Sequence, residues 1–205
     1  MPRRNSPRSE NLRRAIAQEA ARVMAEHGIQ DYRAAKRKAA DRFGVAEDGS
    51  LPSNAEVEAS LLEYQRLFAA GTHGATLRAQ RSVALRAMRS LAAFSPRLVG
   101  PVLAGTATAH NDVQLHLFTD RPESVALNLL DRGVGHDVGE HRLRVDAERF
   151  QVFPSVQFEI DAHTIDATVF PVDGIRQAPI SPVDGRPMRR ADASELEALL
   201  AEGAI

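Results

Sequence analysis

The chain has 205 residues, enough for one or two small domains with a buried core, and it carries a formal net charge of −1. It has no cysteine, which excludes a disulfide framework and a cysteine-ligated zinc site. No apolar run approaches the roughly 20 residues that span a bilayer, and the basic N-terminus lacks the apolar core of a secretory signal. These features predict a soluble, cytoplasmic protein with no membrane partner.

The charge is unevenly distributed along the chain. Residues 1–44 hold 11 Lys and Arg against 5 Asp and Glu, and no acidic residue occurs from Ala69 to Asn111. Basic stretches of this kind indicate an anionic partner such as a nucleotide phosphate or a nucleic acid, or else a solvated helix face. Both interpretations stay open at this stage.

The first part of the chain is typical of helices. Residues 1–10 are predicted to form a disordered basic tail, and residues 11–95 a region of about four helices. The apolar periodicity and the capping residues place the helices at about 11–27, 32–43, 54–68 and 75–94, with a break at Gly71–Gly74.

Two of these helices present basic faces. Lys36, Arg37 and Lys38 lie together in the second helix, and four arginines of the fourth helix fall within about 140° of one another. We expect this second face to lie over a Gly105-Thr106 turn and to meet phosphate; the alternative is ordinary solvent exposure. The four arginines are Arg78, Arg81, Arg86 and Arg89.

Ser95-Pro96 marks a change to strand patterns, and residues 96–175 are predicted to form a small mixed β-sheet domain with flanking helices. The fold class is therefore α+β. The predicted elements are a buried strand over 97–104, a turn at Gly105-Thr106, a strand over 112–118, a helix over 122–132, a strand over 134–145, an irregular segment over 150–154, and a hairpin of 156–160 with 165–172.

Residues 176–205 are predicted to be a proline-rich extended tail with a short closing helix. Ser194 and Glu197 have the spacing of a capping box for that helix.

The alternation of the strand after Gly105-Thr106 predicts a polar site on one face of a sheet. Asp112, Gln114 and His116 share one side of this strand. They offer ligands to a transition metal, although positions i and i+4 of a strand are about 13 Å apart. Asp166 lies alone in a later apolar strand, where it either faces water or forms an acid–base pair with His163.

This stretch resembles the nucleotidyltransferase superfamily, which has the DNA polymerase β-like fold. The signature of that superfamily is Gly-Ser, a short spacer, and then Asp-x-Asp or Asp-x-Glu opening a hydrophobic strand. Gly105-Thr106 corresponds to Gly-Ser, Asp112 to the first carboxylate and Asp166 to the third, within a resemblance that covers residues 96–172. Gln114 stands where the second carboxylate is expected.

The resemblance implies a site for a nucleoside triphosphate with Mg²⁺. Asp112 and Asp166 would be the metal-binding, catalytic residues, and the neutral Gln114 would weaken the metal site. Phosphate binding would fall to Gly105, Thr106, Gln114, Arg78, Arg81 and Arg89. Two hypotheses follow: transfer of a nucleoside monophosphate to an unknown acceptor, or an inactive module that binds nucleotide, or binds nucleic acid or a protein partner through its basic helical faces.

Overall fold

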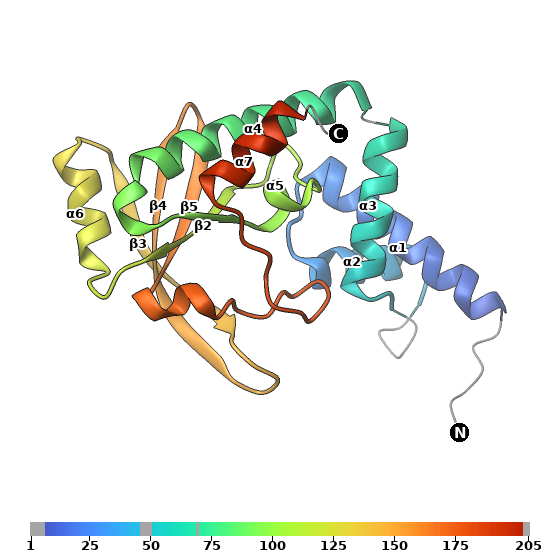
Figure 1. Ribbon diagram of the computed structural model, residues 1–205. Coiled ribbons are helices and arrows are strands. Elements are labelled where there is room, and N and C mark those ends of the chain that lie inside the picture. The colour runs from blue at the N-terminus through green and yellow to red at the C-terminus, as the bar shows by residue number, and fades with distance from the viewer. Residues whose placement is uncertain (1–6, 46–50, 69, 203–205) are drawn as a thin grey trace. The chain divides into compact units, whose positions relative to one another are not determined.

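The computed structural model describes residues 7–45, 51–68 and 70–202, and it divides the chain into two compact units. The helical unit comprises residues 1–73 with 108–110 and 182–184, and the sheet unit comprises residues 74–107, 111–181 and 185–205 (Figure 1). The fold is α+β, with a helical N-terminal region and a mixed sheet, as the sequence predicts.

The described part of the helical unit is built mainly from α1 (Pro7–His27), α2 (Tyr32–Arg42) and α3 (Asn54–Phe68). Asp31 caps α2 by accepting a hydrogen bond of 2.8 Å from the Arg33 backbone N–H. α1 already begins within the predicted tail, of which residues 1–6 lie outside the described part of the chain. Apolar side chains, most of them small or branched, pack between the helices: Ile16, Ala17, Ala20, Val23, Met24, Ala35, Ala39 and Val57.

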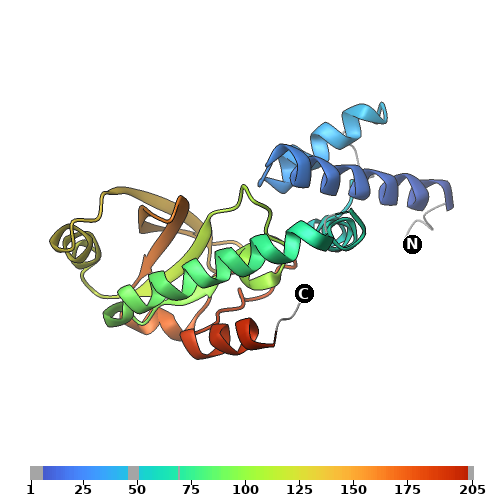
Figure 2. The ribbon, with the colours of Figure 1, turned by 90° about the horizontal axis from the view of Figure 1, so that it is seen from above.

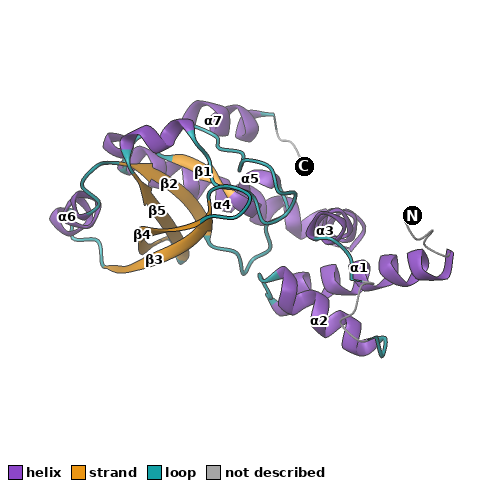
Figure 3. Cartoon of the chain, turned by 90° about the horizontal axis from the view of Figure 1, so that it is seen from below, coloured by secondary structure: helices purple, strands orange, loops and turns teal. Residues whose placement is uncertain are grey.

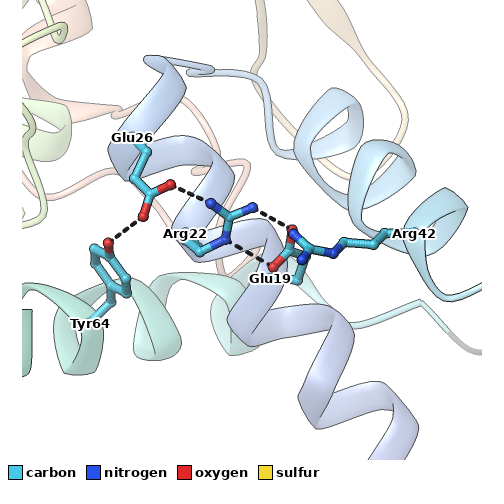
Figure 4. A network of polar contacts seen from close by, with 5 residues as sticks. All are labelled: Glu19, Arg22, Glu26, Arg42 and Tyr64. Carbon is cyan, nitrogen blue, oxygen red and sulfur yellow. Dashed lines mark hydrogen bonds and ion pairs between the residues drawn. The ribbon is translucent and has the colours of Figure 1, made fainter.

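A network of polar contacts joins the three helices (Figure 4). Glu19 of α1 accepts hydrogen bonds of 2.8 Å from both Arg22 and Arg42. The Tyr64 hydroxyl of α3 donates a 2.7 Å hydrogen bond to Glu26, which also pairs with Arg22. Part of the positive charge of the helical unit is therefore already neutralised by its own acidic residues.

α4 (Ala70–Ser90) is continuous through the glycines that the sequence analysis interprets as a break, so that prediction is wrong. A glycine in a helix costs about 1 kcal/mol relative to alanine, which the flanking turns of a long helix can offset. From Leu77 onward, α4 contributes to the core of the sheet unit, although the sequence analysis assigns it to the helical region. A 3₁₀ turn, η1 (Ala92–Phe94), follows it.

The sheet contains β1 (Arg97–Val99), β2 (Val113–Phe118), β3 (His136–Arg144), β4 (Phe150–Ile160) and β5 (His163–Phe170). Their order is β1-β2-β5-β4-β3 (Figure 3). β2 and β5 are parallel, and the other neighbours are antiparallel. β4 and β5 form the predicted hairpin, which turns at Asp161 and Ala162, both with positive φ as a two-residue type I′ loop requires.

One face of the sheet is apolar and packs against helices. α4 runs along this face (Figure 2), and side chains of α6 (Glu123–Asp131) and α7 (Ala193–Ala201) join the same core. The strand residues in this core are Leu98, Val113, Leu115, Leu117, Val156, Phe158, Ile165, Ala167 and Val169. Because side chains alternate along a strand, the residues between these point to the opposite face of the sheet.

Three local predictions for the sheet unit are wrong. The strand predicted over 97–104 ends at Val99, and a short helix, α5 (Gly100–Ala104), follows because Pro101 suits its first turn. The predicted irregular segment is the first half of β4, where Pro154 is tolerated because the ladder with β5 extends only to Ser155. The capping box of α7 is formed by Asp192 with Glu195 rather than by the predicted pair.

The helix predicted over 122–132 is present as α6, whereas the strand predicted over 165–172 ends at Phe170. α6 ends where Gly133 adopts a positive φ of 69°. A 3₁₀ turn, η2 (Val172–Arg176), follows β5. None of the helices in the described ranges has the length and apolar character needed to cross a membrane.

Candidate functional site

The face of the sheet opposite the helices gathers polar side chains from four strands, and we call it the polar face. The register sets Gln114 beside Asp166 and His116 beside Thr168 across β2 and β5. β4 adds Ser155, Gln157 and Glu159, and β3 adds Asp137 and His141. The polar site predicted from the alternation of β2 therefore lies on a surface that several strands share.

Asp112 and Asp166 come together on the polar face from neighbouring parallel strands. Asp112 directly precedes β2, and Thr164 near the start of β5 forms a side-chain hydrogen bond with it. Burial raises the pKa of the Asp112 carboxyl, the Asp166 carboxylate raises it further, and the Thr164 bond partly opposes both. Two carboxylates thus lie close together in a half-buried environment, which favours binding of a proton or a cation between them.

His141 is a member of this cluster that the sequence analysis does not identify. Its Nε2 lies 2.8 Å from Oδ1 of Asp166. The bond to Asp166 raises the pKa of the His141 imidazole, while burial opposes this shift. The partner of Asp166 is therefore His141; the ring of His163, the partner weighed from sequence, donates its Nδ1–H to the backbone oxygen of Asp161 instead.

Gln114 packs against the first residue of α5. Gly100 has a φ of +69°, and a Cβ built on it would lie 3.0 Å from Cδ of Gln114 and closer still to its Oε1. A side chain at Gly100 is therefore disfavoured mainly by its backbone conformation, because the Gln114 atoms that it would meet are the end of a flexible side chain. Gly100 therefore borders the polar face beside Gln114.

His116 closes one end of the polar face. Its Nδ1 accepts a 3.0 Å hydrogen bond from Nε of Arg190, whose guanidinium lies 4.9 Å from the Phe118 ring centroid and 5.1 Å from that of Phe170. Burial lowers the pKa of His116 to about 3, with Arg190 and His141 contributing. His116 is consequently neutral and buried, and it is not available as a metal ligand beside Asp112.

Gly105 and Thr106 form the end of α5, not a turn between two strands. Gly105 caps this helix with a φ of +85°. Its N–H and that of Thr106 both donate to the Pro101 oxygen, at 2.9 and 3.0 Å. Because these donors are already engaged at a helix C-terminus, the phosphate-binding role expected for Gly105 and Thr106 is not supported by the local geometry.

Three of the four arginines of α4 have partners within the sheet unit. Arg81 is buried and lies beside Gly105 as expected, but it donates to the backbone oxygens of Val102 and Leu103, at 3.2 and 3.5 Å. Arg86 pairs with Asp161, and Arg89 pairs with Glu197. Arg78 is exposed. The face is therefore not the acid-free phosphate surface that the local sequence suggests.

The described residues include no group of three or more His, Cys, Asp and Glu side chains arranged to hold a metal ion. Asp112 and Asp166 offer two carboxylates, and Gln114 adds a neutral amide beside Asp166. This donor set suits one hard cation that takes further ligands from a bound molecule. It does not provide the three carboxylates of a two-metal centre.

No protein-family model, curated protein or solved structure matches this chain.

Proposed function

We propose that the sheet unit is a nucleotidyltransferase-like domain that binds a nucleoside triphosphate with one Mg²⁺ ion at Asp112 and Asp166. The observation that carries the proposal is the meeting of these carboxylates, from distant parts of the chain, where Asp112 leads into β2 and Asp166 lies on the parallel strand β5. Mg²⁺ is usually bound through one or two carboxylates together with substrate phosphates. When bound, the ion supplies charge neutralisation at the phosphates.

The other residues of the cluster have distinct tasks in this proposal. The Gln114 amide donates a hydrogen bond to a phosphate oxygen where an acidic residue would repel it. His141 holds the Asp166 carboxylate in one orientation through its 2.8 Å bond. Because His141 occupies one oxygen of Asp166 and Gln114 is neutral, the site supports binding with a single ion better than two-metal transfer.

Isothermal titration with Mg²⁺ and each of the four nucleoside triphosphates tests the proposal. Asp112→Asn and Asp166→Asn should each weaken binding by about tenfold or more, because each removes one of two anionic ligands. Asp131→Asn, an exposed carboxylate at the end of α6, is the matched control and should bind as the wild type does. Binding that persists without Mg²⁺ and in both site variants would contradict the proposal.

Transfer of a nucleoside monophosphate to an acceptor is the second candidate function. The observation that favours it is a cavity that has room for an acceptor molecule. This cavity is lined in part by Thr164, the hydrogen-bond partner of Asp112. An assay with α-labelled nucleotides and a cell extract as the acceptor pool separates the two functions. Label incorporation by the wild type that requires both aspartates supports transfer, whereas incorporation only by Gln114→Asp shows that the wild type does not transfer.

A further inference from the structure

A cavity of about 730 Å³ opens at one end of the polar face. Three strand ends form one side of it, represented by Asp137 of β3, Glu159 of β4 and Thr164 of β5. The segment Gly133–His136, which connects α6 to β3, forms the other side. This volume lies within the range of sites for small molecules.

The cavity is continuous with the cluster of the proposed nucleotide site. Thr164 lines the cavity and also forms a side-chain hydrogen bond with Asp112. Glu159 pairs with Thr164 in the ladder, and Gln157 pairs with Asp166 and also lines the cavity. A ligand in the cavity would therefore lie beside a nucleotide held at Asp112 and Asp166.

The charged side chains that line the cavity indicate which kind of ligand it would bind. Asp137 and Glu159 are exposed, and neither forms an ion pair among the residues that the structure describes. The described residues that line the cavity include no lysine or arginine. Two carboxylates without a cationic neighbour in a concave surface attract a cation and repel a second phosphate compound.

The neutral groups of the lining favour hydroxyl groups on the same ligand. The Gln157 amide and the Thr164 hydroxyl each both donate and accept. A Cβ added at Gly133 or at Gly135 would meet no atom within 4 Å, so the wall there leaves room for a ligand.

We propose that this cavity binds a small molecule that carries a protonated amine and several hydroxyl groups. Its amine lies between Asp137 and Glu159, and its hydroxyl groups contact Gln157 and Thr164. The position of this ligand beside a nucleotide rests on the proposed function, whereas its binding in the cavity does not.

Glucosamine, N-acetylglucosamine and glucose 6-phosphate form a matched set of cationic, neutral and anionic probes. Titration of ¹⁵N-labelled protein should shift the amide signals of Gly133, Gly135 and Thr164 with glucosamine, and the shifts should weaken at high salt. The neutral and anionic probes should shift them less. Equal responses to all three probes, or no response to glucosamine at these amides, would overturn the proposal.

Charge-removing variants locate the amine. Asp137→Asn and Glu159→Gln should each raise the glucosamine Kd by up to about fivefold, the range of an exposed ion pair. Glu140→Gln removes an exposed carboxylate of the same strand β3 outside the cavity, and its Kd should stay at the wild-type value. A Kd that changes equally in all three variants reports general charge attraction and overturns the assignment.

Repeating the titration with saturating Mg²⁺ and ATP separates this inference from the proposed function. Simultaneous binding of both ligands supports a site beside the nucleotide. Competition between them overturns that placement. If ATP does not bind at all but glucosamine still shifts the cavity amides, the proposed function fails while the amine site stands.

Discussion

The buried His116 imidazole makes the stability of the sheet unit depend on pH. Its side chain is 3% exposed, and its pKa is lowered from 6.5 to about 3. The groups that face it are Arg190, His141 and Arg97, the last of which pairs with it across β1 and β2. All three are cations or can become cations, so none stabilises a proton on His116 in the folded state.

The sign and size of the effect follow from proton linkage. The folded state of His116 binds its proton less tightly than the unfolded state does, so its contribution to stability is complete above pH 6.5 and is lost as the pH falls toward about 3. Each pH unit within that window costs about 1.4 kcal/mol. Acidification from about pH 7.5 to about pH 5 should therefore remove about 2 kcal/mol from the free energy of unfolding.

Urea denaturation of the wild type and of His116→Gln at both pH values measures this loss. Glutamine retains an acceptor for Nε of Arg190 but has no titrating group, so the difference between the two proteins isolates His116 from the other histidines. The wild type should lose about 2 kcal/mol more than the variant over this range. Parallel losses in the two proteins would refute the assignment of His116 as a neutral, buried base.

Three further substitutions test local geometry through urea or thermal denaturation. Gly100→Ala should lower the free energy of unfolding by about 1–3 kcal/mol. Adding Gln114→Ala removes the clash with that side chain but not the strain of the positive φ, so the double variant should regain only part of this loss. Ala162→Gly should stabilise by about 1 kcal/mol, since φ of Ala162 is +59°; an unchanged midpoint contradicts this. Arg81→Met should cost about 1–3 kcal/mol, because buried carbonyls at the end of α5 lose their donor, whereas Arg78→Met should be neutral.

Much of the sheet unit can be predicted from alternation along the strands. The period of two in β2 and β5 correctly assigns Gln114 and Asp166 to the polar face and Ile165 to the core. The short loop between β4 and β5 fixes their antiparallel pairing, which sets Gln157 opposite Asp166. These patterns are local, so the sequence alone indicates them.

The parts of the site that the sequence does not reveal depend on contacts between distant segments. His141 reaches Asp166 only because β3, β4 and β5 lie side by side in one register, which no spacing in the sequence encodes. α5 has only five residues, which are too few to show a helical period in the sequence. The sequence therefore does not indicate that Gly105 ends a helix. The acids that neutralise Arg86 and Arg89 come from other elements of the sheet unit.

Substitution of Gln114 by an acidic residue tests whether the polar face binds a cation. A carboxylate at this position would stand directly beside Asp166, whose own carboxylate is hydrogen-bonded to His141, and would add a third negative charge to the cluster. Gln114→Asp should therefore raise the affinity for Mg²⁺ measured without nucleotide, because a third anion offsets more of the charge of the ion. The contact of Gln114 with Gly100 depends on shape rather than charge, so Gln114→Glu preserves the packing while adding the same charge. Tighter Mg²⁺ binding in both variants would mean that the wild-type site is limited by charge, whereas tighter binding in neither would mean that Asp112 and Asp166 do not form a cation site.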